Sequence, residues 1–122
     1  MKFERIISNN TCIALVVSDE KIVVDTQSAL DLIVSVKYDT GAERIILDKN
    51  NIAEEFFVLS SGMAGEILQK FINYHVKVAI YGDYSKYTSK PLKDFTYESN
   101  NGRDIFFTDS REEAIEKLTQ VR

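Results

Sequence analysis

Polar side chains that could bind a ligand or accept a phosphoryl group gather at predicted strand ends and at one predicted helix start. Three aspartates each follow an apolar run: Asp48, Asp83 and Asp109. A second group, Ser60, Ser61 and Gly62, directly precedes an amphipathic segment. Ligands of α/β sheets bind beyond the carboxyl ends of parallel strands, where helix N-termini also present free amides. Turns also favour aspartate and helix starts favour serine, and no fixed spacing ties the aspartates together, so both interpretations stay open.

Residues typical of catalysis are few. His75 is the only histidine, so a Ser/His/Asp triad would have to use it, and its predicted place at a helix end suits an imidazolium. Cys12 is the only cysteine, and we interpret it as a small apolar strand residue. We therefore favour a binding module over an enzyme and predict no cofactor. The remaining enzymatic alternative is a Mg²⁺ site formed by Asp48 and Asp83.

Composition limits the classes of partner. The 122 residues are 44% hydrophobic and 28% charged, which predicts one globular domain over residues 1–122. The net charge of -4 disfavours binding to nucleic acid, whose phosphates would be repelled. The longest apolar run, from Cys12 to Val17, is too short for a membrane span or a signal core. We expect a cytoplasmic protein that does not insert into a membrane.

The first half of the chain alternates strand and helix patterns. FERIIS and TCIALVV, separated by Asn9 and Asn10, predict a hairpin. Ser28 with Asp31 predicts a helix start, and the helix should run to about residue 39, before Gly41. Its expected buried side is Leu30, Ile33 and Val34. RIILD, ending at Asp48, predicts a strand covered on both faces, whereas residues 49–59 have no clear period and stay unassigned.

The second half continues the alternation. A helix follows Ser60 and Ser61 and ends near residue 74, with apolar residues at helical spacing: Ala64, Ile67, Leu68, Phe71 and Ile72. A strand over 76–83, a helix after Ser89, a strand over 104–109 and a helix after Ser110 complete the order. Aromatic residues concentrate in and around the 81–97 segment, where we expect core packing for most, with a partner surface as the alternative: Tyr81, Tyr84, Tyr87, Phe95 and Tyr97. The predicted fold is α/β, a mixed sheet opened by the hairpin and mostly parallel afterwards.

The stretch from Arg44 to Asp83, RIILDKNNIAEEFFVLSSGMAGEILQKFINYHVKVAIYGD, resembles the anti-sigma-factor antagonist (STAS) domains. Their pattern has a strand ending in Asp, a short apolar segment, an Asp-Ser-Ser-Gly-like turn, an amphipathic helix and a strand. The resemblance implies that Ser61 accepts a phosphoryl group from a kinase and that Asp48 is the strand-end aspartate. Where the STAS pattern has an acidic residue before the serine pair, this chain has Leu59. The full chain is also similar to a bacterial family of stand-alone domains of unknown function.

Two functions are compatible with these features. The first is a non-enzymatic regulatory or protein-interaction module that contacts a protein partner around Ser61 and is switched by phosphorylation of that residue. The alternative is a small-ligand binding domain that uses Asp48 and Asp83 as polar contacts, with Ser60 and Gly62 at the same corner. The sequence leaves open whether the chain forms a homo-oligomer.

Overall fold

The two apolar runs at the start of the chain pair as an antiparallel hairpin in the computed structural model, which describes residues 1–122. Strand β1 (Lys2–Ser8) pairs with β2 (Thr11–Val17), with Ser8 opposite Thr11. The turn residues Asn9 and Asn10 have φ values of 49° and 64°. Tight hairpin turns of this kind require positive φ at both central residues, and asparagine tolerates it. The predicted hairpin is confirmed.

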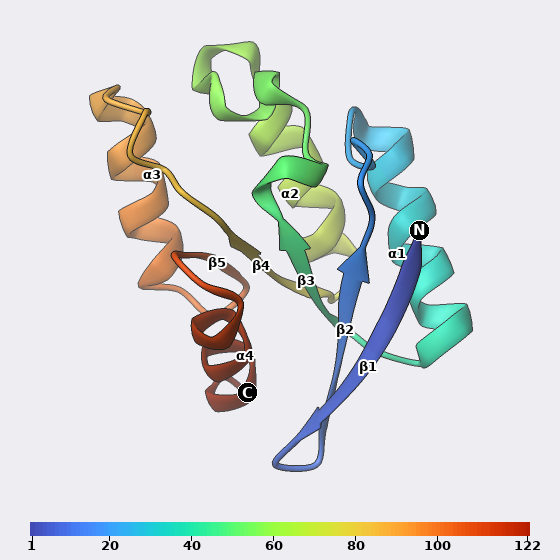
Figure 1. Cartoon of the computed structure of the whole chain (residues 1–122). Helices are drawn as coiled ribbons and strands as arrows, with labels where there is room; N and C mark the ends of the chain where they lie inside the picture. Colours follow the sequence, from blue (N-terminus) through green and yellow to red (C-terminus); the bar gives the residue numbers. More distant parts are fainter.

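The remaining strands extend this hairpin into one mixed sheet in sequence order, β1-β2-β3-β4-β5. Strands β3 (Arg44–Asp48), β4 (Lys77–Tyr81) and β5 (Ile105–Thr108) run parallel to β2. Each parallel connection contains a helix: α1 (Thr26–Thr40), α2 (Met63–Asn73) and α3 (Lys90–Asn100) (Figure 1). Helix α4 (Arg111–Gln120) follows β5. The predicted α/β class is confirmed.

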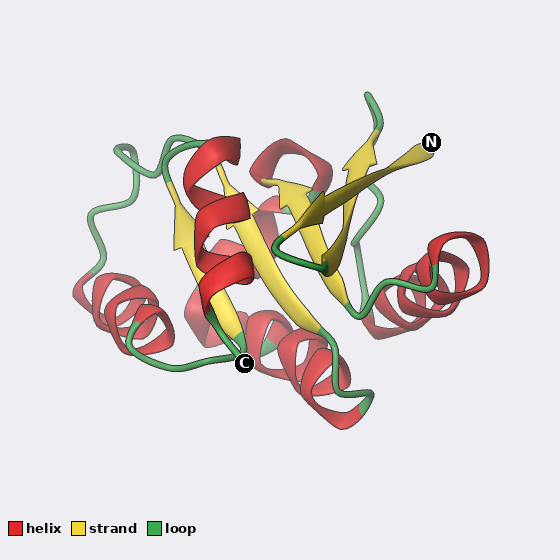
Figure 2. Ribbon diagram, turned by 90° about the horizontal axis from the view of Figure 1, so that it is seen from below, coloured by secondary structure: helices red, strands yellow, loops and turns green.

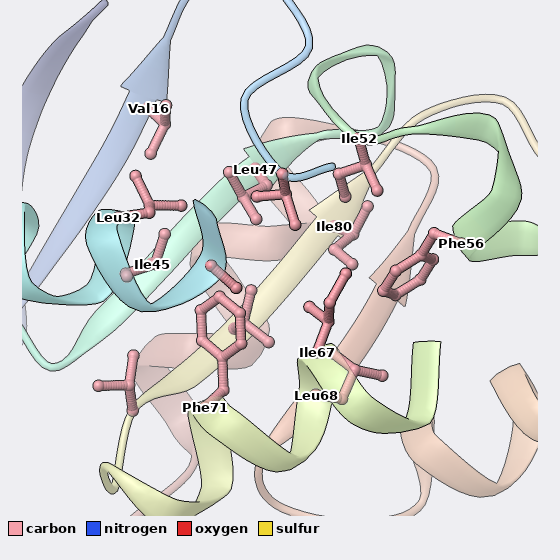
Figure 3. Close-up of a cluster of buried hydrophobic side chains, with 14 of the residues drawn as sticks. Val16, Leu32, Ile45, Leu47, Ile52, Phe56, Ile67, Leu68, Phe71 and Ile80 are labelled. Carbon is pink, nitrogen blue, oxygen red and sulfur yellow. The ribbon is translucent and has the colours of Figure 1, made fainter. Parts of the chain in front are cut away.

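Helices cover both faces of the sheet, with α1, α2 and α3 on one face and α4 on the other (Figure 2). Because successive side chains of a strand point to opposite faces, the core consists of two clusters, one on each face of the sheet. On β3, Ile45 and Leu47 join a cluster of 22 buried residues beneath α1, α2 and α3, part of which Figure 3 shows. Ile46 faces a cluster of 7 buried residues against α4. The central strands are therefore apolar without interruption, as expected for strands covered on both faces. None of the helices is long and apolar enough to cross a membrane.

Helix boundaries differ from the predictions at the start of α1. Asp25 is its N-cap, and Ser28 is the third helical residue of a capping box rather than the cap itself. The hydrogen bond from the Ser28 amide to the Asp25 carboxylate, 2.8 Å long, lowers the pKa of that carboxyl. The predicted end is confirmed, because Gly41 has φ 73° and closes the helix. Val34, expected to be buried, is 59% exposed.

The unassigned segment after β3 consists of three short 3₁₀ turns, Lys49–Asn51, Glu54–Phe57 and Leu59–Ser61. Such turns have no long-range period, which explains why the sequence pattern was uninformative there. The segment nevertheless contributes Ile52, Phe56 and Phe57 to the main core. The 3₁₀ segment, residues 49–61, is therefore held firmly at the carboxyl end of the sheet.

A side chain of α3 forms hydrogen bonds with the backbone of the edge strand β5. The Asn100 amide donates to the Phe107 carbonyl over 3.1 Å and accepts from the Phe107 amide over 2.7 Å. Asn100→Ala should lower the free energy of unfolding by about 1–3 kcal/mol, because two half-buried backbone groups lose their partner. Chemical denaturation measures the change. Asn101→Ala is the control, since Asn101 is exposed at the end of the helix, and an equal loss in both variants would contradict the role of Asn100.

Candidate functional site

The predicted phosphoacceptor lies directly before α2. Ser61 is exposed and ends the last 3₁₀ turn, and Gly62 follows it with φ 79°, a conformation that favours glycine. The Ser61 hydroxyl donates to the Glu55 carbonyl over 2.8 Å and accepts from the Met63 amide over 3.2 Å. Ser61 therefore joins the 3₁₀ segment to the first turn of α2 while its side chain remains accessible.

An open groove of about 570 Å³ lies beside this serine, between the 3₁₀ segment and the start of α3. Figure 1 places both segments at the same end of the molecule. The lining of the groove is half apolar and includes Ser60, the other serine of the predicted site: Phe57, Val58, Leu59, Ser60, Ser89 and Pro91. Val58 is 53% exposed there. We call this feature the 3₁₀–α3 groove.

Two of the three predicted aspartates cap the turn that follows a strand, whereas Asp109 is exposed after β5. The Asp48 carboxylate accepts from the Asn50 amide over 2.8 Å, and the Asp83 carboxylate accepts from the Ser85 amide over the same distance. Hydrogen bonding to Ser85 lowers the pKa of Asp83. Asp48 lines a small pocket on the α4 side of the sheet, whereas Asp83 does not line that pocket.

Residues suited to metal binding do not converge. The structure contains no group of three or more His, Cys, Asp or Glu side chains that could hold a metal ion, so nothing supports the Mg²⁺ alternative. His75 is exposed beyond the end of α2 with φ 59°, next to an apolar hollow between α1 and α2. Cys12 is half-buried on β2. Both residues lie at the amino ends of parallel strands, Cys12 in β2 and His75 before β4, whereas Ser61 follows the carboxyl end of β3.

A lysine that the sequence pattern did not single out supports the groove from behind. Lys49 is only 8% exposed, and its Nζ lies 5.3 Å from the centre of the Phe57 ring and 4.9 Å from that of Tyr87. The Tyr87 hydroxyl donates to the Glu54 carboxylate over 2.8 Å, and Lys86 forms an ion pair with the same carboxylate. Lys86 and Tyr87 together lower the pKa of Glu54. This lysine–aromatic cluster ties the loop after β4 to the 3₁₀ segment.

Most aromatic residues of the 81–97 segment pack in the core, as the main interpretation predicted. Tyr84 packs against Phe107, and its hydroxyl donates to the Ile80 carbonyl over 2.6 Å. Burial raises the pKa of Tyr84. Phe95 also contacts Phe107, whereas Tyr97 is 71% exposed. Only Tyr97 is thus left largely in solvent.

The fold and its strand-end corner define a class of α/β domain with a mixed five-stranded sheet, four helices and an open groove beside an exposed helix-start serine. Residues 8–118 match the family model described as domain of unknown function (DUF4180). The protein belongs to this family, which confirms the predicted membership of a family of unknown function. No curated protein and no solved structure matches the chain.

Proposed function

We propose that the protein is a non-enzymatic regulatory module that binds a protein partner through the 3₁₀–α3 groove and the adjoining Ser61. The observation that carries the proposal is the position of an accessible serine beside a partly apolar groove. The Ser61 side chain is exposed, and its neighbour Ser60 lines the groove. Protein interfaces combine an apolar centre with a polar rim, which is the composition of this corner.

The shape of the groove favours a protein segment over an enclosed ligand. Small-molecule sites are usually concave cavities that cover most of the ligand, whereas this groove is open along one side. Val58 offers an exposed apolar contact, while the half-buried Leu59 and the buried Phe57 form the wall behind it. Because the lysine–aromatic cluster fixes Phe57, the surface is organised before a partner arrives.

Phosphorylation of Ser61 would change both charge and local structure. The modified oxygen loses the proton that it donates to the Glu55 carbonyl, so the hydrogen bond that holds Ser61 to the preceding turn of the 3₁₀ segment is broken. The free amides of the first α2 turn stabilise added negative charge, while Glu54 and Glu55 repel it. The resemblance of residues 44–83 to the STAS pattern supports Ser61 as the acceptor. A phosphorylated chain would therefore present an altered groove edge to its partner.

Substitutions at Ser61 and in the groove test this proposal. Immobilised parent, Ser61→Ala, Ser61→Asp and Val58→Asp proteins are compared for partners retained from extracts of the native host. We expect Ser61→Asp to alter the retained set and Val58→Asp to abolish it, because a charge enters the apolar centre. Ser61→Ala should retain the parent's partner and lose at most about 0.5–2 kcal/mol of folding stability through its missing capping bond.

Val34→Asp is the matched control for the groove, because Val34 is a valine of similar exposure on α1, outside the 3₁₀–α3 groove. It should retain the parent's partner. Identical partner sets for the parent, Ser61→Asp and Val58→Asp proteins would contradict the proposal. Loss of binding in the Val34→Asp variant as well would show that the effect does not come from the groove.

A further inference from the structure

The two edges of the sheet differ in how their backbone groups are satisfied. At one edge, the Asn100 side chain forms hydrogen bonds with both the amide and the carbonyl of Phe107 on β5. At the other edge, β1 pairs only with β2, and no backbone group outside β2 forms a hydrogen bond to it. Figure 1 shows β1 along the outside of the sheet. The β1 edge is therefore the one that is free to accept a further strand.

The hairpin turn determines which residues of β1 turn their backbone groups outward. Both turn residues have positive φ, and a two-residue turn of this type joins its flanking residues, here Ser8 and Thr11, by a hydrogen bond. Hydrogen-bonded and non-hydrogen-bonded pairs then alternate along an antiparallel ladder. The amide and carbonyl of every second residue of β1 therefore point away from β2: Phe3, Arg5 and Ile7.

The side chains of β1 select the strand that this edge can accept. Each of the seven β1 residues faces one residue of β2, so the strand has no bulge, and it contains no proline that would block pairing. Lys2 and Glu4 are exposed on the same face of β1 and carry opposite charges. A strand that presents the same two charges in reverse order matches both of them. A second copy of β1, running antiparallel, is such a strand.

We propose that two copies of this chain pair through their β1 edges and form a symmetric dimer with one continuous sheet. In the proposed antiparallel register, Phe3 lies opposite the partner's Phe3, and Lys2 lies opposite the partner's Glu4. By symmetry, Glu4 faces the partner's Lys2, so two ion pairs form across the interface. Registers that place Glu4 or Arg5 opposite its own copy bring like charges together, and the register centred on Ile6 forms no ion pair.

A hollow beside the first half of β1 fits this arrangement. It has a volume of about 420 Å³, lies between β1 and α1, and has Arg5 and Asp39 among its lining residues. Neither of these two side chains forms an ion pair within the chain. In the proposed register the partner's Arg5 lies opposite Met1, which also lines the hollow. The dimer therefore brings a second positive charge to the hollow that Asp39 lines.

Sedimentation equilibrium of the full chain over a concentration series measures the dissociation constant of the dimer. We expect a reversible dimer, and Arg5→Pro should raise its dissociation constant about tenfold or more, because proline removes an outward amide. Urea denaturation should show that this variant still folds, since pairing with β2 does not use that amide and edge strands tolerate proline. A monomer throughout the series would overturn the proposal, as would a dimer that Arg5→Pro leaves intact.

Reversal of the charges on β1 tests the register. Glu4→Lys and Lys2→Glu each place like charges opposite one another and should raise the dissociation constant about fivefold or more. The double variant Lys2→Glu/Glu4→Lys restores opposite pairs and should dimerise within about threefold of the parent. Glu98→Lys makes the same change of charge at an exposed position on α3 and should dimerise as the parent does. A double variant that dimerises no better than the single variants would overturn the proposed pairing.

Discussion

Phe71→Ala should lower the free energy of unfolding by about 3–5 kcal/mol, the usual cost of truncating a buried phenylalanine. Phe71 is 1% exposed and projects from α2 into the main core (Figure 3). The surrounding strand residues, among them Ile45 and Val78, are themselves fully buried, so they have little freedom to close the cavity. Both the lost apolar contacts and the remaining cavity therefore contribute to the cost.

The neighbouring residue supplies the control for this prediction. Ile72→Ala removes a side chain of similar character from the same helix, but Ile72 is 40% exposed and lies outside the core clusters. We expect a loss below about 1 kcal/mol, near the range of surface substitutions. Urea denaturation with an unchanged slope measures both changes. Similar losses for the two variants would mean that α2 is rotated about its axis relative to the structure described above.

Ile72 also shows how far helical periodicity defines a buried face. The sequence pattern correctly assigned Ala64, Ile67, Leu68 and Phe71 to the core, because their spacing places them on one stripe. Ile72 has the same spacing but lies at the margin of that stripe and is 40% exposed. Val34 on α1, which was predicted to be buried, is exposed for the same reason. Apolar residues at a stripe margin can face solvent, and only the packing of neighbouring helices decides their burial.

The site was less predictable than the fold because its residues converge through tertiary contacts. Turn chemistry identified Ser61 and Gly62, since a helix start favours these residue types locally. Asn51 and Arg111 have no local signal and are 60 positions apart in the sequence. Both line the small pocket beside Asp48, because β3 ends at Asp48 and α4 covers that face of the sheet. The pairing register of the strands, which brings these segments to one pocket, is not visible in any sequence pattern.

Gly82→Ala should also destabilise the protein, by about 1–3 kcal/mol, because its added methyl group would overlap a buried side chain. A Cβ atom at Gly82 would lie 2.7 Å from the Cβ of Lys49, and the Gly82 φ of 157° is itself unfavourable for alanine. Lys49 has little room to withdraw, because it is 8% exposed and its Nζ lies over two aromatic rings. We therefore expect the lysine–aromatic cluster to loosen, and partner binding through the 3₁₀–α3 groove to weaken with it.

Gly65→Ala makes the same chemical change where the structure predicts the opposite sign. Gly65 lies inside α2, is exposed, and would place its Cβ with no other atom within 4 Å. Alanine restricts the unfolded chain more than glycine does, so this variant should gain about 0.5–1 kcal/mol. Thermal and urea unfolding of the two variants, measured side by side, give the signs. A stabilising Gly82→Ala would show that Lys49 can leave the cluster without cost, and the groove wall behind Phe57 would then be a flexible surface.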